Sequence, residues 1–229
     1  MPDKSEFHRL KSLGFFLVIF TLASLSACAG PTSNTVLTEH NRLSDSAYDA
    51  IINFRAIDYD RLGAACLLAS NEARAANGAK LVTHHPKLEF TGREYAKTMS
   101  RDQFFAHEHP TDPSQQTPEI RARNSGVKNP FIAENLALIQ GYPVPNGTPV
   151  YVRQGGFSVT PDGPVIGPHT YRSVAKYVVQ GWLDSPGHRR NLLSGDALQL
   201  GCGAALTSQG EMPMFLFVQN FQLYEPISE

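Results

Sequence analysis

The chain has 229 residues, of which 41% are hydrophobic and 18% are charged, and its formal net charge is −1. This length predicts one domain with additional segments, and the hydrophobic fraction is sufficient for an ordinary core. The near-neutral charge and the lack of any Lys/Arg run exclude a basic surface for nucleic acid, so we expect no nucleic-acid partner.

The N-terminus carries the features of an export signal. Basic residues precede an apolar run, Phe15–Leu25, which has the length of a signal-peptide core and is too short for a comfortable membrane span. The run ends in Leu-Ser-Ala-Cys, a tetrapeptide that resembles the bacterial lipobox. This resemblance implies that residues 1–27 are a cleaved signal peptide and that Cys28 is acylated. An ordinary secretory signal with an incidental Cys is the alternative.

Acylation of Cys28 would anchor the protein to a membrane, because two or more acyl chains bind stably where one binds only marginally. Residues 28–60 begin with the linker-like GPTSNT and are predicted to form a tether. Ala29 after the Cys fits an outer-membrane lipoprotein, facing the periplasm or the cell surface, if the cell is Gram-negative. Export also places Cys66 and Cys202 in an oxidising compartment, which favours one disulfide over two buried free thiols.

Two helices are predicted at the start of the compact domain. From Leu62 onward, apolar residues recur every three or four positions, and Gly78 is a natural end for this helix. A second helix is predicted from Pro86 to about Arg101. The two His residues directly before Pro86 are expected in a surface loop.

The middle of the chain contains candidate polar site residues. His107 and His109 are two residues apart, so on an extended segment they would point the same way, with His109 at the rim of a site. Residues 118–124 are predicted to form a short helix. Residues 127–140 are predicted to form a strand, or a strand that leads into a turn of helix. Within them Glu134 is a carboxylate among apolar neighbours, which must be hydrogen-bonded or have a perturbed pKa.

Residues 141–169 are rich in Gly and Pro and are predicted to be an insertion between core elements, with a β-hairpin formed by VYVRQ and FSV. Residues 171–184 are predicted to form a helix with Trp182 on its buried face. A Ser-Pro-Gly break then separates this helix from a short helix at 188–193.

The C-terminal part predicts two strands, at residues 198–206 and 214–224, joined by a turn. The second strand is apolar on both faces, so we expect a central strand that is covered on both sides. Helices that flank a small antiparallel sheet give the α+β fold class.

Several segments together carry a family resemblance. They occur in one order: NEARAANGAKLV, FFAH, AENLA, GWLDSPGHRRNLL, LGCGAAL and VQNF. In combination they resemble the bacterial branch of the CAP superfamily, the SCP-like proteins related to cysteine-rich secretory proteins, antigen 5 and plant pathogenesis-related proteins. The resemblance implies a three-layer α-β-α sandwich and a CAP domain at residues 61–225, with the insertion at about 141–169.

The resemblance also implies a cleft in which two His and two acidic residues can hold a divalent metal, often zinc. The matching positions are His107, Glu134 and His188. The second acid of eukaryotic members corresponds to Ser185, with Asp184 beside it, which is a departure from the full set of four ligands. No catalytic residue is assigned, because the chain has neither a G-x-S-x-G nucleophile nor a phosphate-binding loop.

Three hypotheses for function remain open at this point. In the first, the protein is a membrane-anchored, non-enzymatic module in the cell envelope that binds a lipid, a sterol, a cell-wall glycan or a protein through its cleft. In the second, it is a zinc-dependent hydrolase, with His107 and His188 as ligands and Glu134 as base or third ligand. In the third, it is a purely structural envelope protein.

Overall fold

The computed structural model describes residues 46–145 and 147–228. The predicted signal peptide, the predicted acylation site Cys28 and the predicted tether up to residue 45 lie outside the described residues. The described chain begins with a 3-10 helix, η3 (Ser46–Asp49). In these two ranges, no helix is both long enough and apolar enough to span a bilayer.

The predicted helices are all present; the predicted ends of residues 118–124 and 171–184 are confirmed, and the ends of the others are shifted. They are α1 (Tyr59–Ala76), α2 (Pro86–Asp102), α3 (Pro118–Asn124), α4 (Tyr171–Asp184) and α5 (Pro186–Leu192). Three of them begin at a Pro, whose fixed φ and missing N–H suit the first helical position. The others begin after capping side chains, Asp58 before α1 and Thr170 before α4.

The main sheet has the strand order β1-β5-β6-β2. Its strands are β1 (Thr83–His84), β2 (Ile132–Gln140), β5 (Ala197–Gln209) and β6 (Met212–Leu223). β6 is antiparallel to both of its neighbours and is central, as predicted. The expectation of a surface loop before Pro86 is wrong at His84, which pairs in parallel with Leu200. A two-residue strand is too short to leave a periodic signal in the sequence.

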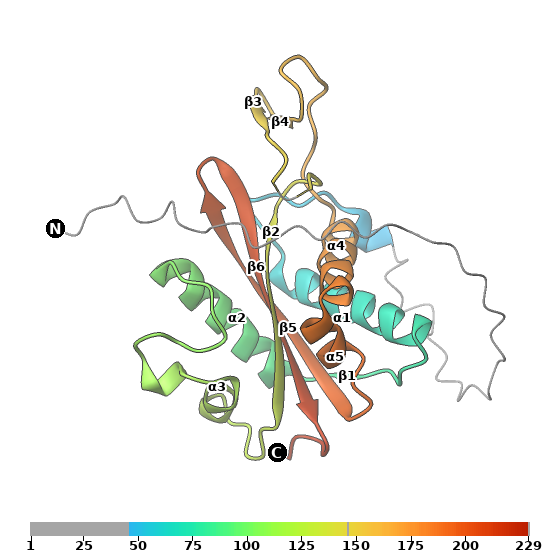
Figure 1. Cartoon of the computed structure of the whole chain (residues 1–229), viewed down its shortest axis with the longest axis vertical. Coiled ribbons are helices and arrows are strands. Elements are labelled where there is room, and N and C mark those ends of the chain that lie inside the picture. Colours follow the sequence, from blue (N-terminus) through green and yellow to red (C-terminus); the bar gives the residue numbers. More distant parts are fainter. Residues whose placement is uncertain (1–45, 146, 229) are drawn as a thin grey trace. The chain divides into compact units, whose positions relative to one another are not determined.

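The alternation of side chains along β6 separates two apolar layers. Phe215 and Phe217 pack in the cluster formed with α1 and α4, whereas Leu216 and Val218 pack with Tyr95 of α2. Figure 1 shows α2 on one side of the strands and α1 and α4 on the other. The three-layer α-β-α sandwich is therefore confirmed.

The Gly residues of the LGCG segment allow α2 to lie directly on β5. A side chain at Gly201 would overlap the α2 backbone at Glu89, and one at Gly203 would overlap it at Arg93. The close approach of this helix to the sheet therefore requires glycine at both positions.

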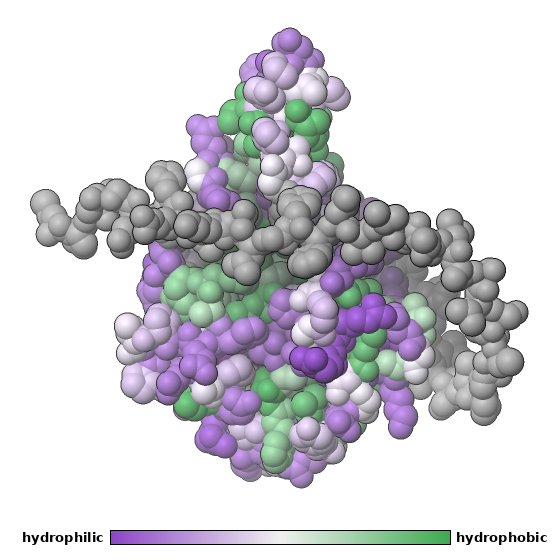
Figure 2. Space-filling model, viewed as in Figure 1, coloured by the Kyte–Doolittle hydropathy of each residue, from purple (hydrophilic) through white to green (hydrophobic). Residues whose placement is uncertain are grey.

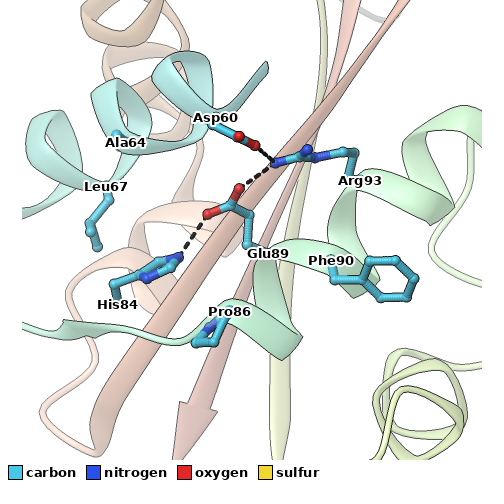
Figure 3. Close-up of a pocket in the computed structure, with 8 residues that line it drawn as sticks. All are labelled: Asp60, Ala64, Leu67, His84, Pro86, Glu89, Phe90 and Arg93. Carbon is cyan, nitrogen blue, oxygen red and sulfur yellow. Dashed lines mark hydrogen bonds and ion pairs between the residues drawn. The ribbon is translucent and has the colours of Figure 1, made fainter. Parts of the chain in front are cut away.

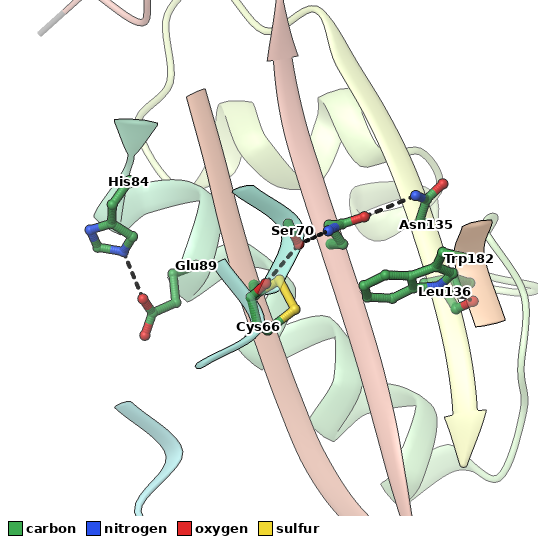
Figure 4. Close-up of a disulfide and its surroundings, with 9 residues drawn as sticks. Cys66, Ser70, His84, Glu89, Asn135, Leu136 and Trp182 are labelled. Carbon is green, nitrogen blue, oxygen red and sulfur yellow. Dashed lines mark hydrogen bonds and ion pairs between the residues drawn. A yellow bond between two sulfur atoms is a disulfide. The ribbon is translucent and has the colours of Figure 1, made fainter. Parts of the chain in front are cut away.

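A disulfide joins Cys66 of α1 to Cys202 of β5 and so links this helix to the sheet (Figure 4). The predicted pairing is confirmed. Both residues are buried and their Cα atoms are 6.1 Å apart. The bond links positions 136 residues apart in the sequence, so it closes a long loop in the unfolded chain.

The segment between β2 and α4 contains a small second sheet, β3 (Tyr151–Arg153) paired with β4 (Gly156–Ser158), as the predicted hairpin requires. His169 holds the base of this segment: its N–H donates to the Gly141 carbonyl (3.0 Å) and its carbonyl accepts from the Ile52 N–H (2.9 Å). Its ring nitrogen Nδ1 is 2.8 Å from Ser173 Oγ. His169 thus helps to hold both the insertion and the first described residues against the domain.

Replacement of both cysteines, Cys66→Ala/Cys202→Ala, should leave the fold recognisable but lower the free energy of unfolding by about 5 kcal/mol, the chain-entropy value for a loop of this length. Urea unfolding of the double variant checks this. Wild-type protein unfolded with and without a thiol reductant is the control, since the reductant should lower only the wild-type stability. Equal midpoints for oxidised wild type and the double variant would contradict the stabilising role.

His169 should make the protein less stable in acid. Burial lowers the pKa of His169 to about 4, whereas the ring in the unfolded chain titrates near 6.5. As the pH falls from about 6.5 to about 4, the unfolded chain therefore binds a proton that the folded chain does not, and stability falls. His169→Asn retains an acceptor for Ser173 but does not titrate, so its stability should change less over this range.

Urea-unfolding midpoints measured between pH 7 and pH 4 test this expectation. His84→Asn, at an exposed His that pairs with Glu89, is the matched control; it retains His169, so its stability should still fall between pH 6.5 and pH 4. Parallel profiles for wild type and His169→Asn would show that another group causes the acid sensitivity.

Candidate functional site

Glu134 is a buried carboxylate on the edge strand β2. Its Oε2 accepts a hydrogen bond from Arg121 Nη2 at 2.7 Å, and its Oε1 is 2.9 Å from His107 Nδ1. The side chains of Glu134 and Arg121 are only 2% and 4% exposed. A buried ionised side chain is stable only when it is paired and hydrogen-bonded. In Glu134 each carboxylate oxygen has such a partner.

Arg121 of α3 also fixes the backbone that carries His107. Its Nη1 donates to the carbonyls of His107 (3.1 Å) and Gln115 (2.7 Å). The guanidinium lies over the ring of Tyr95, 3.4 Å from its centroid, and Tyr95 Oη donates to the Ala106 carbonyl (2.9 Å). Burial raises the pKa of Tyr95 to about 12, so this hydroxyl remains a donor at neutral pH. These contacts orient the His107 ring toward Glu134 while leaving its side chain 51% exposed.

His188 approaches β2 from the opposite face, on α5. Its carbonyl accepts from Asn135 Nδ2 (3.1 Å), and Asn191 of the same helix donates to the Asn135 side chain (3.0 Å). Burial lowers the pKa of His188, and the nearby positive form of His107 lowers it further. At neutral pH the His188 ring is therefore uncharged and can accept a hydrogen bond or bind a metal through nitrogen.

A chain of buried hydrogen bonds connects Asn135 to the disulfide, as Figure 4 shows. Asn135 Nδ2 donates to Gln219 Oε1 (2.9 Å), Gln219 Nε2 donates to Ser70 Oγ (2.8 Å), and Ser70 Oγ donates to the Cys66 carbonyl (2.6 Å). Asn135, Gln219 and Ser70 are fully buried. A satisfied buried network of this kind has one arrangement, so the position of α5 beside β2 is fixed from within the core.

Arg74 fixes the other end of α5. This buried side chain of α1 donates from Nη1 to the Leu192 carbonyl (2.7 Å) and from Nη2 to the Ser194 carbonyl (3.1 Å). Leu192 is in the last turn of α5, where carbonyls have no partner within the helix, and Ser194 lies just beyond the helix. By holding the end of α5, Arg74 also helps to position His188 on the same helix, although the two residues are far apart in sequence.

The remaining predicted site residues do not join His107, Glu134 and His188. Asp184 is exposed and accepts from Gln180 Nε2 on its own helix (2.8 Å). Ser185 is the residue between α4 and α5, and its N–H donates to the Trp182 carbonyl (3.3 Å). Trp182 is buried as expected and donates from Nε1 to the Leu136 carbonyl (3.0 Å).

The donor set does not fit a three-ligand zinc centre. Catalytic zinc sites usually have three protein ligands, and within the described residues no three His, Cys, Asp or Glu side chains are grouped to hold a metal ion. The physical reason is that both oxygens of Glu134 are bonded to Arg121 and His107. No reaction step through zinc is therefore derived.

The expectation that His107 and His109 point the same way is wrong. The His109 side chain is 6% exposed, and its Nδ1 accepts from the backbone N–H groups of Thr111 and Asp112. The segment bends there instead of running straight. His109 is thus a buried support of the loop, not a rim residue.

Figure 3 shows a hollow of about 410 Å³ elsewhere on the domain, lined by residues of α1, of α2 and of the segment before α2. His84 Nε2 is 2.7 Å from Glu89 Oε2, and Arg93 Nη2 donates both to Glu89 Oε1 and to Asp60 Oδ1. Leu67 belongs to its apolar lining. The charged groups pair with one another, so they join the two helices rather than pointing free charges at the hollow.

Comparison with known proteins gives the family. The model of the CAP family, described as the Cysteine-rich secretory protein family, matches residues 67–221. The chain belongs to the CAP family. Among curated proteins, none matches it significantly in sequence.

Two solved structures resemble this CAP domain at low identity. An extracellular SCP-domain protein from Bacillus anthracis is 19% identical with a TM-score of 0.46, and the match covers 72% of this chain and 41% of that one. An outer surface protein from Borrelia burgdorferi is 16% identical with a TM-score of 0.43, and the match covers 68% of this chain and 89% of that one.

Removal of Arg121 should destabilise the protein far more than removal of a neighbouring exposed arginine. Arg121→Met leaves the Glu134 carboxylate buried without its cation, which should cost about 3–5 kcal/mol. In Arg121→Met/Glu134→Gln the unpaired charge is also removed, so part of the stability should return. Chemical unfolding of the variants measures both effects.

Arg123→Met is the matched control, because Arg123 lies on the same helix and is exposed. It should change the free energy of unfolding by less than about 0.5 kcal/mol. If Arg121→Met were as mild as Arg123→Met, the ion pair would not hold the site together.

Proposed function

We propose that this CAP protein is an extracytoplasmic, lipid-anchored binding module that recognises cell-wall glycan at the surface formed by His107 and His188. The observation that carries the proposal is the state of Glu134. A general base must be able to reach a proton on water or substrate. This carboxylate is instead buried and bonded through both oxygens, so it acts as a fixed support for His107.

The two imidazoles support binding of polar groups. His107 directs Nδ1 to Glu134, which leaves Nε2 on the exposed side of the ring. His188 is uncharged at neutral pH for the reasons given above. Ring nitrogens of this kind donate to and accept from hydroxyl and amide groups, which are abundant in glycan. A lipid or sterol would require a larger apolar lining than these residues supply.

The proposed location follows from the N-terminal sequence. The signal-like run and the Cys28 lipobox support export and acylation, and acylation supports attachment to the outer membrane if the cell is Gram-negative. The buried disulfide is in keeping with an oxidising compartment. A glycan ligand would lie within reach of a protein anchored in this way.

Co-sedimentation with purified peptidoglycan tests the proposal. Wild type should sediment with it, and His107→Ala and His188→Ala should each weaken binding about tenfold, the effect of losing one or two hydrogen bonds. His84→Ala, which removes another exposed His with a carboxylate partner, is the matched control and should bind like wild type.

Two results would contradict the proposal. One is the absence of binding, or equal binding by wild type and His107→Ala. The other is a sub-micromolar zinc site in a calorimetric titration that His107→Ala abolishes, together with hydrolysis of glycan by the zinc-loaded protein. That result would favour the hydrolase hypothesis.

A further inference from the structure

The insertion presents apolar side chains to solvent on a segment that has almost no charge. Tyr151, Val152, Val159 and Val165 are all exposed, Val152 by 60%. The acidic and basic side chains of residues 141–169 are Arg153 and Asp162, which pair with each other at 3.4 Å. Single exposed apolar residues are ordinary, but a group on one protruding element indicates a contact surface. Figure 2 shows hydrophobic residues on the sides of this projecting part, below a hydrophilic tip.

The insertion has a small core of its own, so this exposure is not the result of an unpacked loop. Phe157 packs against Tyr142 with ring centroids 4.8 Å apart, in a cluster that includes Met212 and Met214 of β6. The Ile166 N–H donates to the Phe157 carbonyl (2.7 Å). The exposed apolar side chains of the insertion therefore remain in solvent although the insertion is folded and packed against β6.

The N-terminal segment enters the domain at the base of this insertion. Ile51 forms a β-bridge with Thr170, and the Phe54 ring lies 5.6 Å from the Tyr142 ring. Ile51 is itself 66% exposed, which adds an apolar side chain to the same end of the domain. Figure 1 shows β3 and β4 beyond the end of the main sheet, on the side where this segment crosses.

Chain length limits how far this end can lie from a membrane anchor. Cys28 and Ser46 are separated by residues 29–45. At no more than about 3.5 Å per residue, that stretch spans at most roughly 60 Å. The described chain begins at this end, so the insertion end is the part of the domain that lies nearest along the chain to an anchor at Cys28.

We propose that residues 141–169 contact the phospholipid surface, with Tyr151, Val152, Val159 and Val165 in the interfacial layer. The inference rests on the lipid anchor of the proposed function. Tyr is suited to this layer because its ring is apolar and its hydroxyl can remain in water. Since the segment has no unpaired charge, contact should be equal on neutral and anionic vesicles and insensitive to salt.

Tryptophan fluorescence in vesicles tests the contact. The acylated full-length protein carrying Val152→Trp is placed in phosphatidylcholine vesicles with or without brominated acyl chains, and Val159→Trp serves as a second probe. Phe131→Trp is the matched control, because Phe131 is exposed and directly precedes the other end of β2. The native Trp182 is 1% exposed and contributes the same background to every variant.

Emission from Val152→Trp and Val159→Trp should shift to the blue and be quenched at least twofold more by brominated lipid than emission from Phe131→Trp. If Cys28 is acylated and the protein binds vesicles but all three probes behave alike, the insertion contact is overturned and the anchor stands. If the emission of the Trp probes shifts to the blue in whole envelopes but not in vesicles, the insertion contacts a protein, and the proposed lipid contact is also overturned. If mass spectrometry shows Cys28 unmodified and Cys28→Ala fractionates like wild type, the anchor fails, and this inference with it.

Discussion

The buried ion pair between Glu134 and Arg121 is the interaction on which the site depends. Neither group can be moved into water without moving an element of the fold, because Glu134 lies within the paired length of β2 and Arg121 lies on α3. Once the pair has formed, its remaining hydrogen bonds determine where the loop before α3 lies, since Arg121 donates to the carbonyls of His107 and Gln115. A buried charge that is satisfied in only one geometry thus specifies a loop that has little regular secondary structure.

The alternation of the edge strand explains how two distant His residues come to flank the same strand. Successive side chains of a strand point to opposite faces. Glu134 therefore meets His107 on the face covered by α2 and α3, whereas Asn135 meets the backbone of His188 on the face covered by α4 and α5. Because β2 is at the edge of the described sheet, no further strand separates the two faces there. Burial lowers the pKa of His188, and the charge of His107 across the strand lowers it further.

Most of the fold could be predicted from the sequence because its signals are local. Pro and Gly mark the helix ends, and the two-sided apolar character of β6 identifies a central strand. The support of the site could not be predicted in this way. A buried Glu134 implies a cationic partner, but Arg121 and Arg123 lie on the same short helix, and only its packing decides which of them faces inward. His109 was misplaced for a related reason, because a bend in the loop removes the alternation that an extended segment would have.

The same strand sets the distance between the site and the membrane-facing end proposed above. Glu134 lies six residues before Gln140, where β2 ends and the insertion begins. At about 3.3 Å per residue, this separation is roughly 20 Å along the strand. A domain anchored by the insertion end would hold His107 and His188 well outside the interfacial layer. Lipid or sterol ligands would then have to leave the bilayer to reach the imidazoles, whereas glycan lies on the outer side already.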